Sequence, residues 1–217
     1  MLDLVLPDTN IWLDIVRARA IGTGKNAAPT TSAADAAHLS QLVAQQRVEV
    51  GVLHIVRIEL QRNHERVIGE ARSAYRETRN RLARLQVDAL SPTALSPDKL
   101  LADDDLIYEQ LLAQASRIDD CEADRAGAEA RYAERRAPAH KGNPKMHDSH
   151  VLEAALRLAR DREPGTTWLV TRNTTEFESA KQALLPQLKQ EYDDAGLEHA
   201  RNLRQYLGVR GYLAQQS

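Results

Sequence analysis

The sequence predicts an α/β fold with a parallel central sheet. Three short runs, residues 2–6, 48–55 and 167–171, are rich in Val, Leu, Ile and Trp, which favours buried strands. The chain between them has the apolar spacing and the helix-forming residues of helices. Strands that alternate with helices are typical of a parallel sheet covered by helices. A length of 217 residues fits one domain that buries its own core.

The first part of the chain contains one strand and two helices. The strand at 2–6 precedes a helix predicted over 11–19, with Asn10 as its N-cap. Gly, Asn and Pro residues predict a loop over 20–31. Ser32 opens a pattern similar to a capping box, which predicts the start of the next helix.

Helix-forming residues dominate the middle of the chain. Residues 56–86 lack Pro and are rich in Ala and Arg, which predicts one long helix or two abutting ones. Two Ser-Pro pairs then interrupt the helical pattern, and residues 98–136 are helical again by composition. Because the block 64–136 has no strand pattern, we expect a helical insertion or cap on a single domain that spans 1–217.

The last third returns to alternating elements. A loop is predicted over 138–144, followed by a helix that opens at His147 and Asp148. The strand at 167–171 comes next, and the remainder is mostly helical with a short strand near 198–201.

Charges are balanced overall but segregated along the chain. The formal net charge is −2, yet seven arginines and only three acids lie between Arg62 and Arg84. The sign reverses over residues 103–124. A local patch, not the total charge, decides whether a protein binds nucleic acid, so the basic stretch is compatible with such a partner. An ordinary solvated helix surface is the alternative interpretation.

The composition also bears on location. No run approaches the roughly 20 apolar residues that a membrane span needs. The N-terminus lacks the apolar core of a signal peptide, and the single Cys121 has no partner for an internal disulfide. We therefore expect a cytoplasmic protein without a membrane partner.

Polar side chains follow the predicted strands. They are Asp8, Thr9 and Asn10 after the first strand, Glu59 after the second, Asp148 at the start of a late helix, and Thr171, Asn173 and Glu176 after the third. Ligands of open parallel sheets sit beyond the carboxyl ends of the strands, so we expect these side chains at one edge. Clustered carboxylates repel one another and usually persist because a divalent cation binds them. Mg²⁺ or Mn²⁺ suits such oxygens and supports hydrolysis of phosphodiesters.

Four segments resemble the motifs of PIN-domain nucleases, in the order in which that family has them. They are the segment 6–13 around Asp8, the helix with Glu59, the segment 145–156 around Asp148, and the segment 169–177 with Thr171, Asn173, Glu176 and Phe177. The resemblance implies a three-layer α/β/α sandwich with a mostly parallel central sheet. The long block 64–136 resembles the larger branches of the family, with a helical insertion.

The resemblance also implies roles for individual residues. It implies a metal-dependent endoribonuclease acting on single-stranded RNA, with Asp8, Glu59, Asp148 and Asn173 as catalytic residues. The first three would bind one or two Mg²⁺ or Mn²⁺ ions, and the auxiliary residues would be Asn10, Thr171, Glu176 and Glu153. Glu153 lies about 140° around the helix from Asp148, so it does not share the same helix face. Two lysines of the preceding basic loop, Lys141 and Lys145, are candidates for binding the phosphate backbone.

Other interpretations remain open from the sequence. Asn173 stands where many PIN nucleases have Asp, which keeps a non-catalytic module that binds RNA or protein as the alternative. A phosphatase with an aspartyl nucleophile is a further alternative. It normally needs a second acid at the position of Asn10, and an asparagine cannot act as that general acid or base. His147 and His150 flank Asp148, but their spacing lacks the further ligands of a zinc site.

The family also suggests partners. RNA is the expected substrate. A toxin-type nuclease would have an antitoxin-like protein partner, and homodimers are common in the family.

Overall fold

The computed structural model describes residues 2–17, 33–84, 97–140, 146–162, 165–179 and 183–213. Within these ranges, five parallel strands form one sheet in the order β3-β2-β1-β4-β5. The strands are β1 (Asp3–Pro7), β2 (Val48–Leu53), β3 (Ser116–Ile118), β4 (Thr167–Val170) and β5 (Leu197–Ala200). This sheet confirms the predicted α/β class and the strands predicted at 2–6, 48–55, 167–171 and near 198–201.

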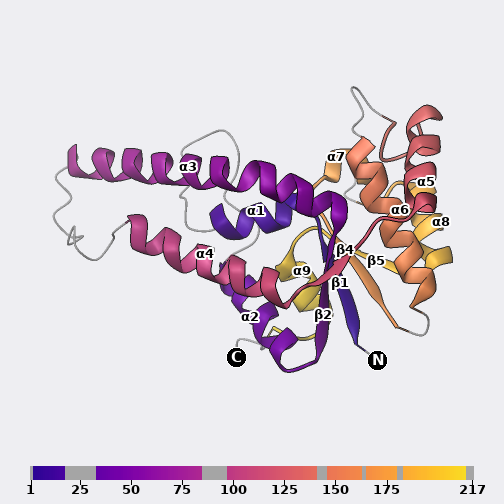
Figure 1. The fold of residues 1–217 in the computed structure, drawn as a ribbon, viewed down its shortest axis with the longest axis horizontal. Coiled ribbons are helices and arrows are strands. Elements are labelled where there is room, and N and C mark those ends of the chain that lie inside the picture. Colours follow the sequence, from indigo (N-terminus) through magenta and orange to yellow (C-terminus); the bar gives the residue numbers. More distant parts are fainter. Residues whose placement is uncertain are drawn as a thin grey trace.

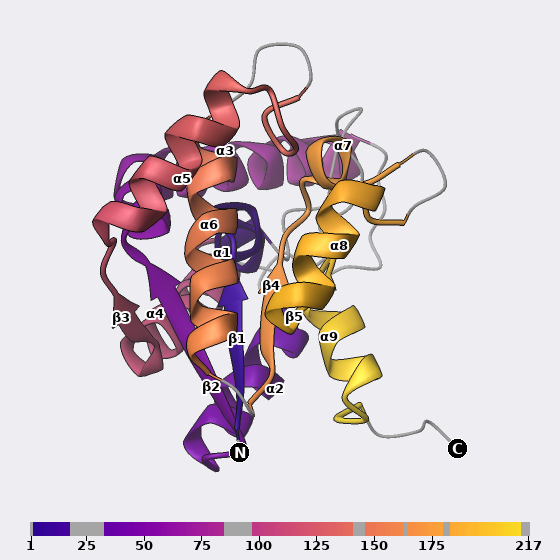
Figure 2. The ribbon, with the colours of Figure 1, turned by 90° about the vertical axis from the view of Figure 1, so that its right-hand side faces the viewer.

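Helices cover both faces of the sheet and give the molecule three layers (Figures 1 and 2). One face carries α5 (Glu122–Ala133), α6 (Met146–Asp161) and α8 (Pro186–Ala195). The other face carries α1 (Thr9–Arg17), α2 (Ala33–Ala44), α4 (Pro97–Gln114) and α9 (Leu203–Val209), and α7 (Thr174–Phe177) is a single turn after β4. Because helices lie on both sides, the central strand β1 is buried along its whole length.

One long helix extends well beyond the sheet. α3 (His54–Arg84) starts directly after β2, and α4 runs back beside it (Figure 1). Of the two alternatives predicted over 56–86, one long helix or two abutting ones, its 31 residues show the first as far as Arg84. With a rise of about 1.5 Å per residue, it is about 46 Å long.

The block 64–136 is not wholly helical, which corrects the sequence prediction. β3 lies in this block and pairs with β2 in parallel, with Ser116 opposite Gly51 and Ile118 opposite Leu53. Ser116 and Arg117 are exposed and only Ile118 is half-buried. A three-residue edge strand with two exposed polar residues carries no apolar alternation, so the helical composition around it conceals it.

The start of α1 also differs from the prediction. The helix begins at Thr9, so Asn10 lies in its first turn, exposed to solvent, and does not cap it. Asp8 takes the preceding position instead, because its carbonyl oxygen accepts the N–H of Ile11 at 2.9 Å. Its carboxylate oxygen Oδ1 accepts the N–H of Thr9 at 2.7 Å.

Some predictions fall outside the described residues. The loop at 20–31, Ser32 and most of the loop at 138–144 are among them. Within the described ranges, no helix combines the length and the apolar character that crossing a membrane requires.

Candidate active site

The carboxyl edge of the sheet gathers polar side chains from several elements. Asp8 follows β1 and Thr171 follows β4. β1 and β4 pair in parallel up to Pro7 and Val170, so Asp8 and Thr171 leave the sheet side by side. Asp148 lies in the first turn of α6 and Glu59 in the second turn of α3. The chain thus brings together residues that lie more than a hundred positions apart.

Asp8 is buried and held on both carboxylate oxygens. The hydroxyl of Thr171 donates to its Oδ2 at 2.8 Å, and the Thr9 N–H donates to its Oδ1. The same Thr171 hydroxyl oxygen accepts the backbone N–H of Asn173 at 3.2 Å. These bonds fix the carboxylate at the end of β1 and tie it to the segment after β4.

Asp148 is the second buried carboxylate of the site. The side-chain nitrogen Nδ2 of Asn173 donates to its Oδ2 at 2.9 Å. Burial and the charge of Asp8 raise the pKa of Asp148 from its ordinary 3.8 to about 6, against the opposing effects of His147 and the Asn173 hydrogen bond. The charge of Glu176 raises it further. The two buried aspartates therefore repel each other.

His147 stands between two of the predicted metal ligands. Its Nε2 lies 3.5 Å from Oδ1 of Asp8 and 3.3 Å from Oε2 of Glu59. Burial by itself would lower the pKa of His147, but the carboxylates of Asp8, Glu59 and Asp148 raise it above its usual value. From the sequence, His147 was considered only as a zinc ligand, and the spacing did not support that role. Its position directly before Asp148 is the signal that could have placed it in the site.

Two further predicted residues lie at this edge in different settings. Glu176, in α7, is half-buried, and its Oε2 has no hydrogen-bond partner among the described residues. Its charge acts on Asp148, so the structure brings Glu176 into the site. Asn10, in contrast, is exposed in the first turn of α1 and makes no hydrogen bond to Asp8 or Asp148 within the described part of the chain.

The remaining predicted residues lie elsewhere or outside the described ranges. Glu153 faces α5, where its carboxylate accepts the Nε–H of Arg131 at 2.8 Å. Arg131 is buried and also binds Glu191 on α8, so Glu153 belongs to a structural ion network. Lys141 and Lys145 lie outside the described residues.

Two other polar groups near the site were not anticipated. His150 does not join His147, because its Nε2 lies 3.6 Å from Asp120. Arg172, next to Asn173, forms an ion pair with the buried Asp14 of α1. The spacing of the histidines does not indicate these partners. Nor does the rule that polar residues after parallel strands gather at one edge of the sheet.

A hard divalent cation fits the chemistry of this site. Carboxylate oxygens are its preferred ligands, and the mutual repulsion of Asp8 and Asp148 is what a bound cation would relieve. Among the described residues, no arginine or lysine pairs with either aspartate. In the same part of the chain, no three His, Cys, Asp or Glu side chains converge on one point as they stand, and His147 lies between Asp8 and Glu59.

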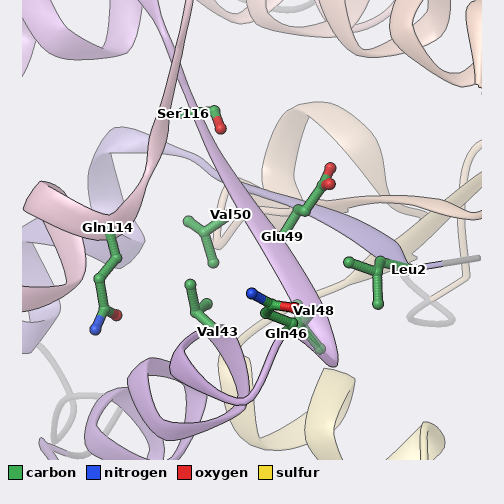
Figure 3. A pocket seen from close by; sticks show the side chains of 8 residues that line it. All are labelled: Leu2, Val43, Gln46, Val48, Glu49, Val50, Gln114 and Ser116. Carbon is green, nitrogen blue, oxygen red and sulfur yellow. The ribbon is translucent and has the colours of Figure 1, made fainter.

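A cavity elsewhere in the molecule does not coincide with this site. Its volume is about 250 Å³, and it lies at the opposite end of the sheet, where β2 begins (Figure 3). Gln46, Val48 and Glu49 line it together with Gln114 at the end of α4. The polar residues after the strands are at the other end of the same sheet, so the cavity belongs to a separate region.

Comparison with known proteins agrees with this geometry. A family model described as PIN domain matches residues 5–177, which include Asp8, Glu59, Asp148 and Glu176. No curated protein and no solved structure matches the chain significantly. PIN domains are mostly metal-dependent nucleases. Because the match covers most of the chain, this protein belongs to the PIN domain family.

Proposed function

We propose that this protein is a metal-dependent endoribonuclease that hydrolyses phosphodiester bonds of single-stranded RNA. The observation that carries the proposal is the pair of buried aspartates, Asp8 and Asp148, at the carboxyl edge of the sheet. Their repulsion contributes to raising the pKa of Asp148 to about 6. Buried negative charge that no arginine or lysine of the described residues offsets, with only His147 beside it, is typical of a cation site.

Asp8, Glu59 and Asp148 would hold Mg²⁺ or Mn²⁺. When bound, the cation would lower the pKa of a water molecule and offset charge on the phosphate under attack. Thr171 holds Asp8 in place, and Asn173 does the same for Asp148. These hydrogen bonds keep the two carboxylates at a fixed separation before substrate arrives.

The amide at position 173 is compatible with this activity. In the structure, the Asn173 nitrogen points at Asp148, so this residue positions a carboxylate instead of adding one. Glu176 lies close enough to raise the pKa of Asp148, and so adds a negative charge near the place where many PIN nucleases have Asp. This supports catalysis over the non-catalytic alternative.

The test is cleavage of labelled single-stranded RNA with Mn²⁺, Mg²⁺ or EDTA. We expect cleavage with either metal and none with EDTA. Asp8→Asn and Asp148→Asn should each lower the rate by roughly a hundredfold or more, because each removes a metal ligand.

A matched control is Asp161→Asn, at the exposed far end of the same helix α6. It makes the same chemical change and should keep the wild-type rate, with folding of all variants checked by circular dichroism. RNA binding without cleavage in any metal would favour the non-catalytic alternative. Equal rates in wild type and Asp148→Asn would contradict the assignment of the site.

A further inference from the structure

We infer that single-stranded RNA reaches the active site along the outward face of α3. The inference rests on the proposed function and adds a binding surface to it. Four exposed arginines define this face, named here the arginine stripe: Arg62, Arg66, Arg72 and Arg76.

The arginine stripe follows from the helical repeat. At about 100° per residue, the four arginines fall within a sector of about 120° and extend for about 21 Å along the helix. The opposite side of α3 is buried: Leu60 and Val67 are in the core, and His64 stacks on Tyr108 of α4. The stripe therefore points away from the packed side.

The stripe begins next to the candidate site. Glu59 is on α3, and Arg62 and Arg66 are one and two turns further along, within about 60° of Glu59 around the axis. Asn63 donates to the carbonyl oxygen of Glu59 at 2.9 Å, and Nη2 of Arg66 donates to Oδ1 of Asn63 at 2.9 Å. Arg66 is also paired with Glu70. These bonds hold the Arg66 guanidinium along the helix that leads out of the site.

The composition of the stripe favours a phosphate backbone over a protein partner. Its sector also holds Gly69, Ser73, Asn80 and the acid Glu65, all exposed, and the exposed acids Glu70 and Glu77 lie beside it. None of these described side chains is apolar, whereas a protein interface needs an apolar or aromatic centre. A nucleic-acid backbone needs mainly spaced positive charges.

Positive charge at this place also answers an electrostatic need. Asp8, Asp148 and Glu176 repel the phosphates of an approaching RNA. An extended row of arginines on the neighbouring helix attracts the flanking phosphates and so offsets that repulsion. Figure 1 shows α3 running from the carboxyl edge of the sheet far out to one side, which gives the strand a continuous path.

The experiment measures the affinity for a fluorescein-labelled oligouridylate by anisotropy in EDTA, over a series of salt concentrations. The test variant carries Arg72→Gln and Arg76→Gln, the two members of the stripe farthest from the candidate site. The control variant carries Arg160→Gln and Arg204→Gln, two exposed arginines at the far end of α6 and on α9. Both variants change the net charge equally.

We expect the test variant to bind several-fold more weakly than the control. The slope of log affinity against log salt should fall by about 1.4, or about 0.7 for each phosphate that is no longer neutralised. Equal affinity and equal slope in both variants would overturn the inference. The same result is expected if the stripe binds a protein partner and not RNA.

A second substrate separates this inference from the proposed function. Bis(p-nitrophenyl) phosphate with Mn²⁺ probes the carboxylate site alone, since it is too small to extend from Glu59 to Arg72 and Arg76, about 20 Å or more along α3. Its hydrolysis should be the same in wild type and in the test variant. If wild type neither hydrolyses it nor cleaves RNA with Mn²⁺, the proposed function fails, and the anisotropy series still decides whether the stripe binds RNA.

Discussion

Two buried aspartates, Asp124 and Asp148, have opposite electrostatic environments. The first bonds to a side chain of α6, and the second belongs to α6 itself. Asp124 of α5 accepts two hydrogen bonds from Arg157 of α6, at 2.8 and 2.9 Å. Burial opposes ionisation of Asp124, but the hydrogen bonds and the charge of Arg157, together with the hydrogen bonds from Cys121, outweigh it and lower the pKa below 3.8. Asp148, in the first turn of the helix, has an amide for a neighbour and Asp8 nearby, and its pKa rises to about 6.

The difference separates a structural carboxylate from one that we propose as a metal ligand. Around Asp124 the chain supplies a cation, the guanidinium of Arg157. In the nearby ion network, Arg131 likewise supplies the cation for Glu153 and Glu191. Around Asp148 and Asp8 the described chain supplies only the imidazole of His147. A buried carboxylate that lacks its own fixed cation destabilises the fold, so its presence points to a ligand that offsets the cost.

The largest stability effect is expected from breaking the structural pair. Arg157→Gln leaves Asp124 buried without its cation and should destabilise the protein by about 3 kcal/mol near neutral pH. The loss should shrink in acid, where Asp124 is protonated in both variant and wild type. Urea unfolding measures it, and Arg160→Gln, an exposed arginine on the same helix, should change stability by less than about 0.5 kcal/mol.

Removing a buried charge from the candidate site should instead increase the stability of the metal-free protein. Asp148→Asn should stabilise the metal-free protein by roughly 2 kcal/mol at neutral pH, below the roughly 3 kcal/mol that the full pKa shift would give.

The sign follows from the raised pKa of Asp148. Its contribution to stability is fully present below about pH 4 and is lost as the pH rises through about 6. The gain in the variant should therefore vanish in acid. Thermal unfolding in EDTA across this range measures it. A destabilised variant at neutral pH would show that Asp148 is compensated after all.

The smallest effect is expected from Glu176→Gln. Removing this charge takes away one cause of the raised pKa of Asp148, so that pKa should move down towards its ordinary range. NMR titration of the side-chain carboxyl carbons measures the shift. Glu198→Gln, exposed on β5, is the matched control and should leave the titration unchanged. An unmoved pKa in Glu176→Gln would place Glu176 outside the site.

Residues that follow parallel strands gather at one edge of the sheet, and this rule accounts for most of the candidate site that the sequence could predict. Asp8 and Thr171 follow neighbouring strands, so parallel pairing alone brings them together. Asp148 required the further recognition that its helix begins at the same edge.

Partners set by side-chain packing were not accessible from the sequence. The pairing of Arg172 with Asp14 and the place of His147 depend on how α1, α3 and α6 pack, which no local pattern encodes. β3 was missed for a related reason, since its three residues owe their conformation to pairing with β2 and not to their own composition.

The central claim is that Asp8 and Asp148 form a cation site, and calorimetric titration with Mn²⁺ tests it most directly. Wild type should bind Mn²⁺, and Asp148→Asn should bind it at least roughly ten- to a hundredfold more weakly. Asp161→Asn, at the other end of α6, should bind as wild type does. Equal Mn²⁺ binding in wild type and Asp148→Asn, or no binding in wild type, would contradict the claim.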